Sequence, residues 1–390
     1  MTSDPRSADE KPRPVIGVIG LGTMGLGMVQ MFLTAGYRVV ATDAYAPVLT
    51  TAPLRLSAAF DARVEAGKLT PDARAVASRD LRLVASPADL RPADLGNAVL
   101  VIEAIAEDLP AKRALFAALE RIVAPDTVLA TNTSSLSVAA VAKGLADPSR
   151  VVGLHFFNPA PVMKLVELIG HAGTDPAALA QARAVGEGAG KTVISAPDRP
   201  GFIVNRCARP YYGEALAMLE EGVRASDIDA ALQASGYRLG PFALIDLVGA
   251  DINLAATEGL SAAMGGHPRY HVFAALKAQV ASGNLGRKSG QGFVFPTEKT
   301  PPPPDAAALA LRIEAALINE AAYLLAEGDL TPDAVDTAMR LGMNFPRGPF
   351  AALKAHGTAR ILATLADLEM RAPAHLKGRY LPAAALKDWA

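Results

Sequence analysis

The sequence has a single cysteine, a single tryptophan and no excess of charge of either sign. Cys207 is the one cysteine among 390 residues, which excludes an intrachain disulfide and any metal site built from several cysteines. The 38 basic and 39 acidic residues leave a net charge of −1, whereas nucleic-acid binding normally needs a basic surface excess. We therefore expect a reducing compartment, no metal and no nucleic-acid partner.

Long hydrophobic runs are also absent. No apolar run approaches the roughly 18 residues of a membrane helix, and the polar, proline-rich first residues have no apolar segment typical of a secretion signal. We expect a cytoplasmic protein with no membrane partner, in which residues 1–13 form a disordered tail. The apolar fraction of 51% and the mean hydropathy of +0.23 still provide a sizeable core. A chain of 390 residues fits two or three domains.

The first half of the chain alternates between strand and helix patterns. An apolar run that begins at Val15 ends in glycine, a helical pattern follows it, and residues 37–43 predict a second strand. This βαβ unit implies a parallel sheet, and with it an α/β Rossmann-type dinucleotide-binding domain over residues 14–197. Further strands are expected at residues 98–103, 127–131, 151–156, 165–169 and 192–195, and helices at 48–65, 71–77, 112–122 and 176–190.

From Phe202 onward the pattern is almost purely helical and repeats itself. Residues 206–222 align without gaps with residues 312–328 at an offset of 106, with matching Arg, Glu, Ala, Leu, Glu and Gly. Each copy continues through an Asp-rich turn and a helix to the tripeptide Gly-Pro-Phe. We interpret the all-α C-terminal region as two similar helical repeats.

A run of four prolines separates the two copies, and polyproline acts as a stiff spacer. The predicted boundaries are therefore a first helical copy over residues 198–296, a Pro-rich linker over 297–304 and a second copy over 305–390. The position that matches Asn205 in the second copy is Leu311, so we expect no catalytic group there.

A glycine-rich turn follows the first strand and has the pattern GxGxxG. The strand before it, the helix after it and an acidic residue at the end of the next strand give this pattern its meaning. The glycines permit a tight turn and close approach to a pyrophosphate, while the acidic side chain accepts hydrogen bonds from ribose hydroxyls and repels a 2′-phosphate. NAD is therefore favoured over NADP. The predicted cofactor-binding residues are Gly20, Leu21, Gly22, Thr23, Met24, Gly25 and Asp43.

Polar residues also follow two later strands, at the edge of an α/β sheet where ligands bind. Residues 132–135 read Asn-Thr-Ser-Ser, and His155 ends another apolar run. Glu167 lies twelve residues beyond His155, and a loop that contains Pro159 and Pro161 allows the chain to turn back and bring the two together. A histidine paired with a carboxylate is a common form of general base. A histidine packed in the core without a catalytic role is the alternative.

Three segments resemble one known family. NTSSL at 132–136, GLHFFNPAPVMKLVE at 153–167 and PGFIVNR at 200–206 are similar, in this order, to the NAD-dependent L-3-hydroxyacyl-CoA dehydrogenases. The resemblance extends over roughly residues 15–295. It implies oxidation of a (3S)-3-hydroxyacyl-CoA to a 3-oxoacyl-CoA, a step of the fatty-acid or aromatic-acid β-oxidation type.

The resemblance also implies roles for individual residues. His155 corresponds to the base that takes the substrate proton, and Glu167 to its partner. Ser134 and Asn205 correspond to residues near the substrate oxygen, and Asn158 to one that shapes the site and approaches the nicotinamide. Family positions that line the cofactor site match Glu107, Lys112, Ser134, Asn158 and Lys288.

Two other functions remain open at this point. The segment GLGTMG with the following GxM also resembles the β-hydroxyacid dehydrogenases, which act on small hydroxy acids and use a lysine in a Gly-rich helix; we find no such helix. A non-catalytic NAD-binding protein is the third possibility. The family's acyl-CoA-binding hairpin matches residues 54–77 only loosely, where Lys68 and Arg63 are within reach of a CoA phosphate or simply face solvent.

In single-copy members of the family, the helical domain is the dimer interface. The duplicated helical module here resembles the C-terminal region of larger fatty-acid-oxidation and phenylacetate-pathway dehydrogenases. Because a two-fold interface uses the same patch on both partners, we expect the second copy to cover that patch within one chain. The protein would then be a monomeric pseudo-dimer, or a dimer through another surface.

Overall fold

The computed structural model describes residues 13–296 and 300–388. The chain divides into unit 1, which ends at Asp198, and unit 2, which begins at Arg199. Most of the expected N-terminal tail and residues 297–299 of the expected linker lie outside the described residues, whereas Arg13 forms an ion pair with Asp80. Over the described part of the chain, no helix has the length and apolar character needed to cross a membrane.

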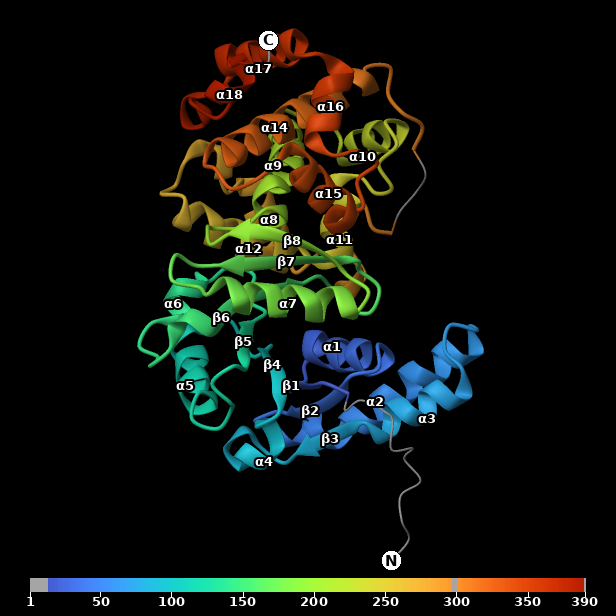
Figure 1. Cartoon of the computed structure of the whole chain (residues 1–390). Coiled ribbons are helices and arrows are strands. Elements are labelled where there is room, and N and C mark those ends of the chain that lie inside the picture. Colours follow the sequence, from blue (N-terminus) through green and yellow to red (C-terminus); the bar gives the residue numbers. More distant parts are fainter. Residues whose placement is uncertain (1–12, 297–299, 389–390) are drawn as a thin grey trace, which may run out of the picture. The chain divides into compact units, whose positions relative to one another are not determined.

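Unit 1 is built on one eight-stranded sheet with the order β3-β2-β1-β4-β5-β6-β7-β8 (Figure 1). All neighbouring strands are parallel except β6 and β7, which are antiparallel. The expected Rossmann-type sheet is thus confirmed, with one reversed pair. The strands are β1 (Val15–Ile19), β2 (Arg38–Thr42), β3 (Leu81–Val84), β4 (Ala98–Glu103), β5 (Val128–Thr131), β6 (Val151–Phe156), β7 (Leu165–Gly170) and β8 (Thr192–Pro197).

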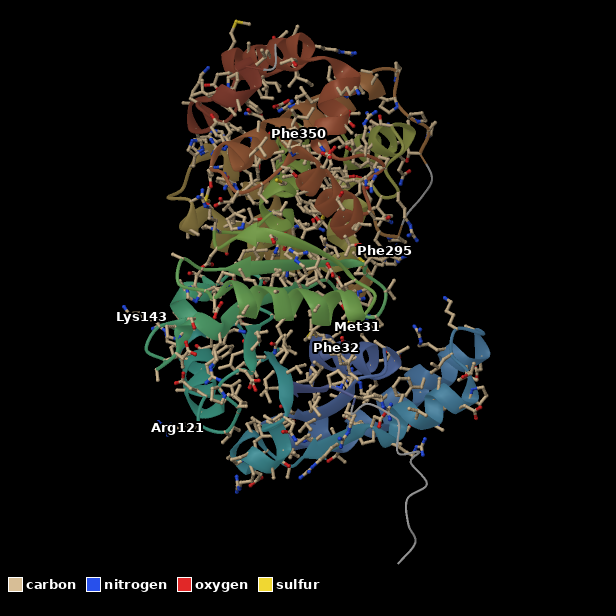
Figure 2. All side chains as sticks on the ribbon, in the orientation of Figure 1. Met31, Phe32, Arg121, Lys143, Phe295 and Phe350 are labelled. Atoms are coloured by element: carbon tan, nitrogen blue, oxygen red, sulfur yellow. The ribbon has the colours of Figure 1, made fainter. Side chains whose placement is uncertain are left out.

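Helices pack on this sheet through apolar side chains. Helix α1 contacts β1 and β2, and α7 runs along β4 to β8. Phe32 of α1, labelled in Figure 2, is fully buried. It makes edge-to-face contacts with Tyr37 and Phe156. The helices of unit 1 are α1 (Thr23–Thr34), α2 (Ala46–Glu65), α3 (Pro71–Arg79), α4 (Pro92–Leu95), α5 (Leu109–Leu119), α6 (Val138–Ala142) and α7 (Pro176–Gly188).

Unit 2 is helical over its described residues, as expected. Its long helix α14 packs against α9, α10 and α16, so helices from both predicted copies share one core. The helices are α8 (Val204–Cys207), α9 (Arg209–Glu220), α10 (Ala225–Ala234), α11 (Pro241–Val248), α12 (Ala250–Ala263), α13 (Ala274–Ala281), α14 (Ala306–Ala326), α15 (Pro332–Met343), α16 (Pro349–His356), α17 (Thr358–Arg371) and α18 (Ala384–Asp388).

An aspartate caps the helix that begins at each Gly-Pro-Phe. Asp229 accepts hydrogen bonds from the N–H groups of Phe242 and Ala243 at 2.9 and 2.7 Å. Asp336 accepts the corresponding pair at the start of α16, both at 2.8 Å. A Cβ on either glycine would lie 2.3 Å from an atom of its aspartate, which explains why both copies have glycine there.

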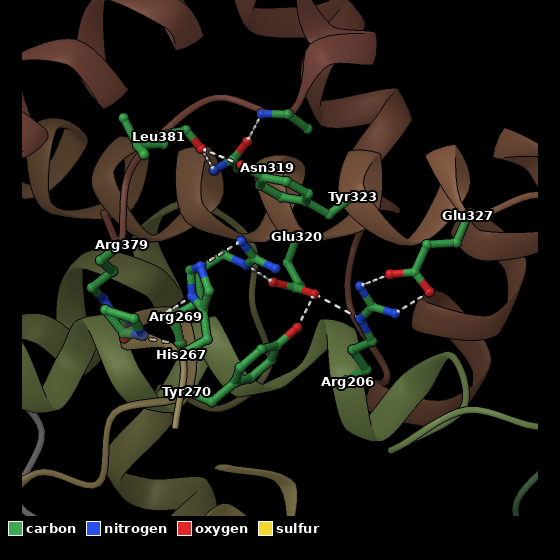
Figure 3. Close-up of polar contacts among 12 residues, drawn as sticks. Arg206, His267, Arg269, Tyr270, Asn319, Glu320, Tyr323, Glu327, Arg379 and Leu381 are labelled. Carbon is green, nitrogen blue, oxygen red and sulfur yellow. Dashed lines mark hydrogen bonds and ion pairs between the residues drawn. The ribbon is translucent and has the colours of Figure 1, made fainter. Parts of the chain in front are cut away.

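A buried ion cluster joins the two predicted copies (Figure 3). Glu320 of α14 is fully buried and accepts hydrogen bonds from Arg206, Arg269 and Tyr270 at 2.8, 2.9 and 2.5 Å. All three donors belong to the first copy. Arg206 also pairs with Glu327, at 2.6 Å.

The same cluster occurs a second time with the copies exchanged. Glu214 of α9 is fully buried and accepts from Arg312, Arg379 and Tyr380 at 3.1, 2.6 and 3.0 Å. Burial alone would raise the pKa of Glu214, but the two arginines hold that pKa below its usual value. Arg312 also pairs with Glu221, as Arg206 does with Glu327. Each predicted copy therefore supplies a donor set and an acceptor set to the other.

We expect the loss of one buried carboxylate to destabilise unit 2 strongly. Glu320→Gln leaves the buried Arg206 and the largely buried Arg269 partly uncompensated, which costs on the order of 3 kcal/mol in the free energy of unfolding. The control Asp227→Asn removes an ion pair with the exposed Arg224 and should cost less than about 1 kcal/mol. Chemical denaturation measures both, and equal shifts for the two variants would contradict this account of the cluster.

Candidate active site

The glycine turn after β1 is shaped by its neighbours. Gly20 has a φ of +96°, and a Cβ there would lie 2.6 Å from the carbonyl oxygen of Ala104. A Cβ on Gly25 would lie 1.8 Å from the carbonyl oxygen of Gly20, so the turn and α1 pack only with glycine. Gly22 differs, since a Cβ there would contact no atom within 4 Å. The backbone at Gly22, just before α1, therefore faces open space.

Asp43, at the end of β2, is tied to this turn. Its carboxylate accepts hydrogen bonds from the N–H groups of Leu21 at 2.6 Å and Tyr45 at 2.7 Å. An open backbone at a helix N-terminus and a carboxylate at the next strand end fit a pyrophosphate and a ribose, respectively. The residues present thus fit a dinucleotide.

A buried pair of a glutamate and a lysine stabilises the carboxyl end of β4. Glu103, the last residue of β4, is fully buried and accepts from Lys112 at 2.6 Å and from the hydroxyl of Thr131 at 2.8 Å. Lys112 has an exposed fraction of only 1% and also contacts Glu107 at 3.2 Å. Lys112 therefore serves as a buried partner of two carboxylates.

Glu107 holds the loop that contains Ser134. One of its oxygens accepts from the hydroxyl of Thr133 at 2.5 Å and from the N–H groups of Ser134 and Ser135 at 3.0 and 3.1 Å. Burial by itself would raise the pKa of Glu107, but the hydroxyl groups of Thr133 and Ser135 and the charge of Lys112 keep that pKa below its ordinary value. Glu107 is thus an anion that orders the loop.

The antiparallel pair β6–β7 brings the expected His155 and Glu167 together. The two residues are directly opposite each other in the register, and Nδ1 of His155 lies 2.7 Å from Oε2 of Glu167. Their exposed fractions are 6% and 0%, so a buried carboxylate contacts a nearly buried imidazole. Next to them, Asn132 accepts a hydrogen bond from the N–H of Phe156 at 2.8 Å and links the Ser134 loop to β6.

The loop between β6 and β7 places Asn158 at the rim of a hollow of about 460 Å³. Thr23 at the start of α1 and the cationic side chains of Arg55, Arg63 and Lys68 also line it. Lys68, which the sequence offered as a substrate contact, is exposed there.

Two predicted site residues belong to unit 2. Asn205 lies in α8, and its carbonyl oxygen accepts from Nε of Arg209 at 3.2 Å. Lys288 is partly exposed and pairs with Asp251 at 2.5 Å.

Sequence reasoning placed Asn132 among the polar residues at this edge without an individual role and assigned no role to Glu103, although both organise the edge. A usable signal existed, because each is a polar residue at the carboxyl end of an apolar strand. Polar side chains at such ends are where ligand sites form in open α/β sheets.

The open space at Gly22 gives a test of the turn that does not depend on stability. We expect Gly22→Ala to keep the melting temperature, since the new methyl group contacts nothing in the protein. It should weaken NADH binding by about tenfold or more, because the backbone must approach the pyrophosphate closely. Fluorescence titration measures this, with Gly259→Ala as the matched control at another open glycine. Unchanged NADH affinity in Gly22→Ala would exclude this turn as the binding site.

Comparison with known families gives the same assignment for both units. The model of the 3-hydroxyacyl-CoA dehydrogenase NAD-binding domain matches residues 15–199. The model of the 3-hydroxyacyl-CoA dehydrogenase C-terminal domain matches residues 201–295 and 309–387.

Individual relatives agree. A 3-hydroxyadipyl-CoA dehydrogenase of Escherichia coli is 33% identical, over 96% of each chain. A 3-hydroxybutyryl-CoA dehydrogenase of Mycobacterium tuberculosis is 39% identical, over 71% of this chain and 96% of its own. The crystal structure of a 3-hydroxybutyryl-CoA dehydrogenase from Escherichia coli has a TM-score of 0.88 and 33% identity, and covers 97% of this chain and 98% of its own. This chain therefore belongs to the 3-hydroxyacyl-CoA dehydrogenases, oxidoreductases that use NAD.

Proposed function

We propose that this protein interconverts (3S)-3-hydroxyacyl-CoA and 3-oxoacyl-CoA, with His155 as the base and Glu167 as its partner. The observation that carries the proposal is the 2.7 Å contact between Nδ1 of His155 and the fully buried carboxylate of Glu167. The names of the relatives, which refer to 3-hydroxyacyl-CoA substrates, support the substrate class.

The pair suits removal of a hydroxyl proton. The carboxylate on Nδ1 keeps a proton on that nitrogen, so Nε2 has the lone pair that accepts the substrate proton. When the imidazole becomes positively charged, the adjacent Glu167 stabilises it. NAD, when bound, accepts the hydride from the same carbon.

Other residues are proposed to bind and orient the substrate. A donor near the substrate oxygen stabilises negative charge that develops there in the reverse reaction. We assign that role to Ser134, whose backbone is held by Glu107. Asn158 is assigned to the region between substrate and nicotinamide. We also assign Asn205 to the substrate and Lys288 to the cofactor, and both assignments rest on their sequence motifs alone.

The hollow beside Asn158 supports a place for the CoA moiety. Arg55, Arg63 and Lys68 bring three positive charges to its lining. CoA carries several phosphate groups, and arginine and lysine are the residues that bind phosphate best in proteins. We therefore propose that Lys68, Arg55 and Arg63 contact the phosphate groups of CoA.

Loss of the base should abolish turnover and spare the cofactor site. We expect His155→Ala to lower kcat by about a thousandfold, within the range for a general acid–base group. NADH affinity should stay unchanged, because the turn at Gly20–Gly25 is untouched. The assay follows reduced-nicotinamide absorbance with acetoacetyl-CoA and a panel of longer and dicarboxylic 3-oxoacyl-CoA substrates.

The control for this variant is His171→Ala, at a histidine in the loop after β7 that should leave kcat unchanged. If the unaltered protein turns over none of the thioesters, or prefers small hydroxy acids, the proposed reaction is wrong. If His155→Ala stays active, another group supplies the base.

We also propose that the two helical copies form an internal pseudo-dimer, in keeping with the domain boundaries expected above. The reciprocal contacts of Glu320 and Glu214 support it, because exchange of the two copies reproduces the cluster. Such reciprocity is the property of a two-fold interface. The second copy, which has Leu311 where the first has Asn205, is then a structural partner without a catalytic role.

A chain that ends at residue 296 should therefore dimerise or aggregate. It would retain Arg206, Glu214 and Arg269, a set that can pair with the same set in another molecule, and it would expose the apolar face under α14. Light scattering on the full and shortened chains measures this, and Glu214→Gln in the shortened chain should weaken its dimer. A shortened chain that stays monomeric, soluble and fully active would contradict the pseudo-dimer.

A further inference from the structure

Lys191 is a buried lysine whose ammonium group contacts two backbone carbonyls. It lies between α7 and β8 and has an exposed fraction of 9%. Its Nζ donates hydrogen bonds to the carbonyl oxygens of Ala160 and Met163 at 2.5 and 2.8 Å. Within the described part of unit 1, no carboxylate forms an ion pair with it. A buried ammonium is costly unless its protons are bonded, so these carbonyls are the partners that stabilise it.

Both carbonyls belong to the loop between β6 and β7, which joins His155 to Glu167 and contains Asn158. Proline at 159 and at 161 leaves this loop short of N–H donors for its own hydrogen bonds. The carbonyl of Pro159 accepts from Val162 and Met163, which forms a compact turn. Lys191 bonds to both ends of this turn, and the N–H of the next residue, Thr192, donates to the carbonyl oxygen of Lys164 at 2.8 Å.

The loop between β6 and β7 also packs against α1. A Cβ on Gly27 would lie 3.3 Å from Pro161 and 3.4 Å from Cβ of Ala160, so helix and loop are already in close contact. The helix that begins at the dinucleotide turn and the ammonium of Lys191 therefore hold one segment between them. The carbonyl of Ala160, which Lys191 binds, lies two residues beyond Asn158 in the chain.

The charged groups that line the hollow beside Lys191 are cationic. Lys164 from the loop and Arg63 from α2 line the same hollow of about 340 Å³, to which α1 adds Met31 and Thr34. On α7, Glu187 pairs with Arg183. The hydroxyl of Tyr37 lies beside Gly188 and bonds to the carbonyl of Val185. Burial, together with the charge of Lys164, lowers the pKa of Lys191 to about 8.

We propose that Lys191 is a positioning residue for the reaction, which holds the loop through Ala160 and Met163 so that Asn158, His155 and Glu167 keep their geometry. This inference rests on the proposed function. In the direction of alcohol oxidation, loss of the ammonium proton at alkaline pH weakens both carbonyl contacts and lowers the rate. The neutral amine still has two N–H donors, but without the charge each bond is weaker.

The test compares Lys191→Met with Lys191→Arg in alcohol oxidation, using the best 3-hydroxyacyl-CoA of the panel. We expect Lys191→Met to lower kcat by about ten- to a hundredfold, as expected for a displaced reacting group, with KM and NADH affinity changed less than about twofold. The unaltered enzyme should lose kcat above pH about 8. That alkaline decline should be absent in Lys191→Met and shifted upward in Lys191→Arg, which also restores most of kcat.

The matched control is Lys164→Met, at an exposed lysine of the same loop. It should retain kcat and shift the alkaline decline slightly upward, because it removes a like charge beside Lys191. A Lys191→Met enzyme with normal kcat, or with lower kcat and the same alkaline decline, would overturn the proposal.

A second measurement does not need activity. Hydrogen exchange at the amides of Val162 and Met163 should be at least about tenfold faster in Lys191→Met than in the unaltered protein at the same pH, because the turn loses its clamp. Unchanged exchange overturns the role of Lys191 even if the panel contains no substrate. Faster exchange in a protein that is inactive on every thioester supports the clamp and rejects the proposed reaction.

Discussion

The antiparallel pairing of β6 with β7 is the constraint on which the site depends. In an otherwise parallel sheet, this one reversal sets His155 directly opposite Glu167, and a shift of one residue would point Glu167 to the other face of the sheet. Because the carboxylate is fully buried, its hydrogen bond with the imidazole replaces one that water would otherwise supply. A sheet is a rigid support, so the pair is oriented before any substrate arrives.

The neighbouring strand ends are connected to this pair by short polar links. Glu103 at the end of β4 binds Thr131 at the end of β5, and Asn132 binds the backbone beside His155. Glu107 adds the loop of Ser134 to the same network. The result is that three successive strand ends behave as one ordered edge, with the glycine turn of β1 and the carboxylate of Asp43 further along the sheet.

Sequence reasoning found those parts of the site that have a local pattern. The glycine turn, Asp43 and the return of the chain from His155 to Glu167 follow from spacing and turn residues. Strand β3 was missed because Arg82 interrupts its apolar residues and only Val84 is buried, whereas β5 of the same length is buried throughout. Helix α6 was missed because five residues are too few to show a helical period. Two contacts could not be predicted: the burial of Lys112 between two acids, and the hydrogen bond from Lys191 to Ala160. Each depends on how separate segments of the chain pack together. The residues of the reciprocal clusters in unit 2 are visible in the sequence, because Arg and Glu recur at an offset of 106. Nothing in the sequence, however, says that each Glu pairs with the other predicted copy.

The central claim is that Nε2 of His155 exchanges a proton with the substrate oxygen. The most direct measurement is a crystal structure of the protein with NAD and acetoacetyl-CoA, or with the thioester from the panel that is turned over fastest. Our expectation is that the 3-oxo oxygen lies within about 3.2 Å of Nε2 of His155 while Nδ1 stays on Glu167. A 3-oxo oxygen bound to a different side chain, with His155 out of reach, would contradict it.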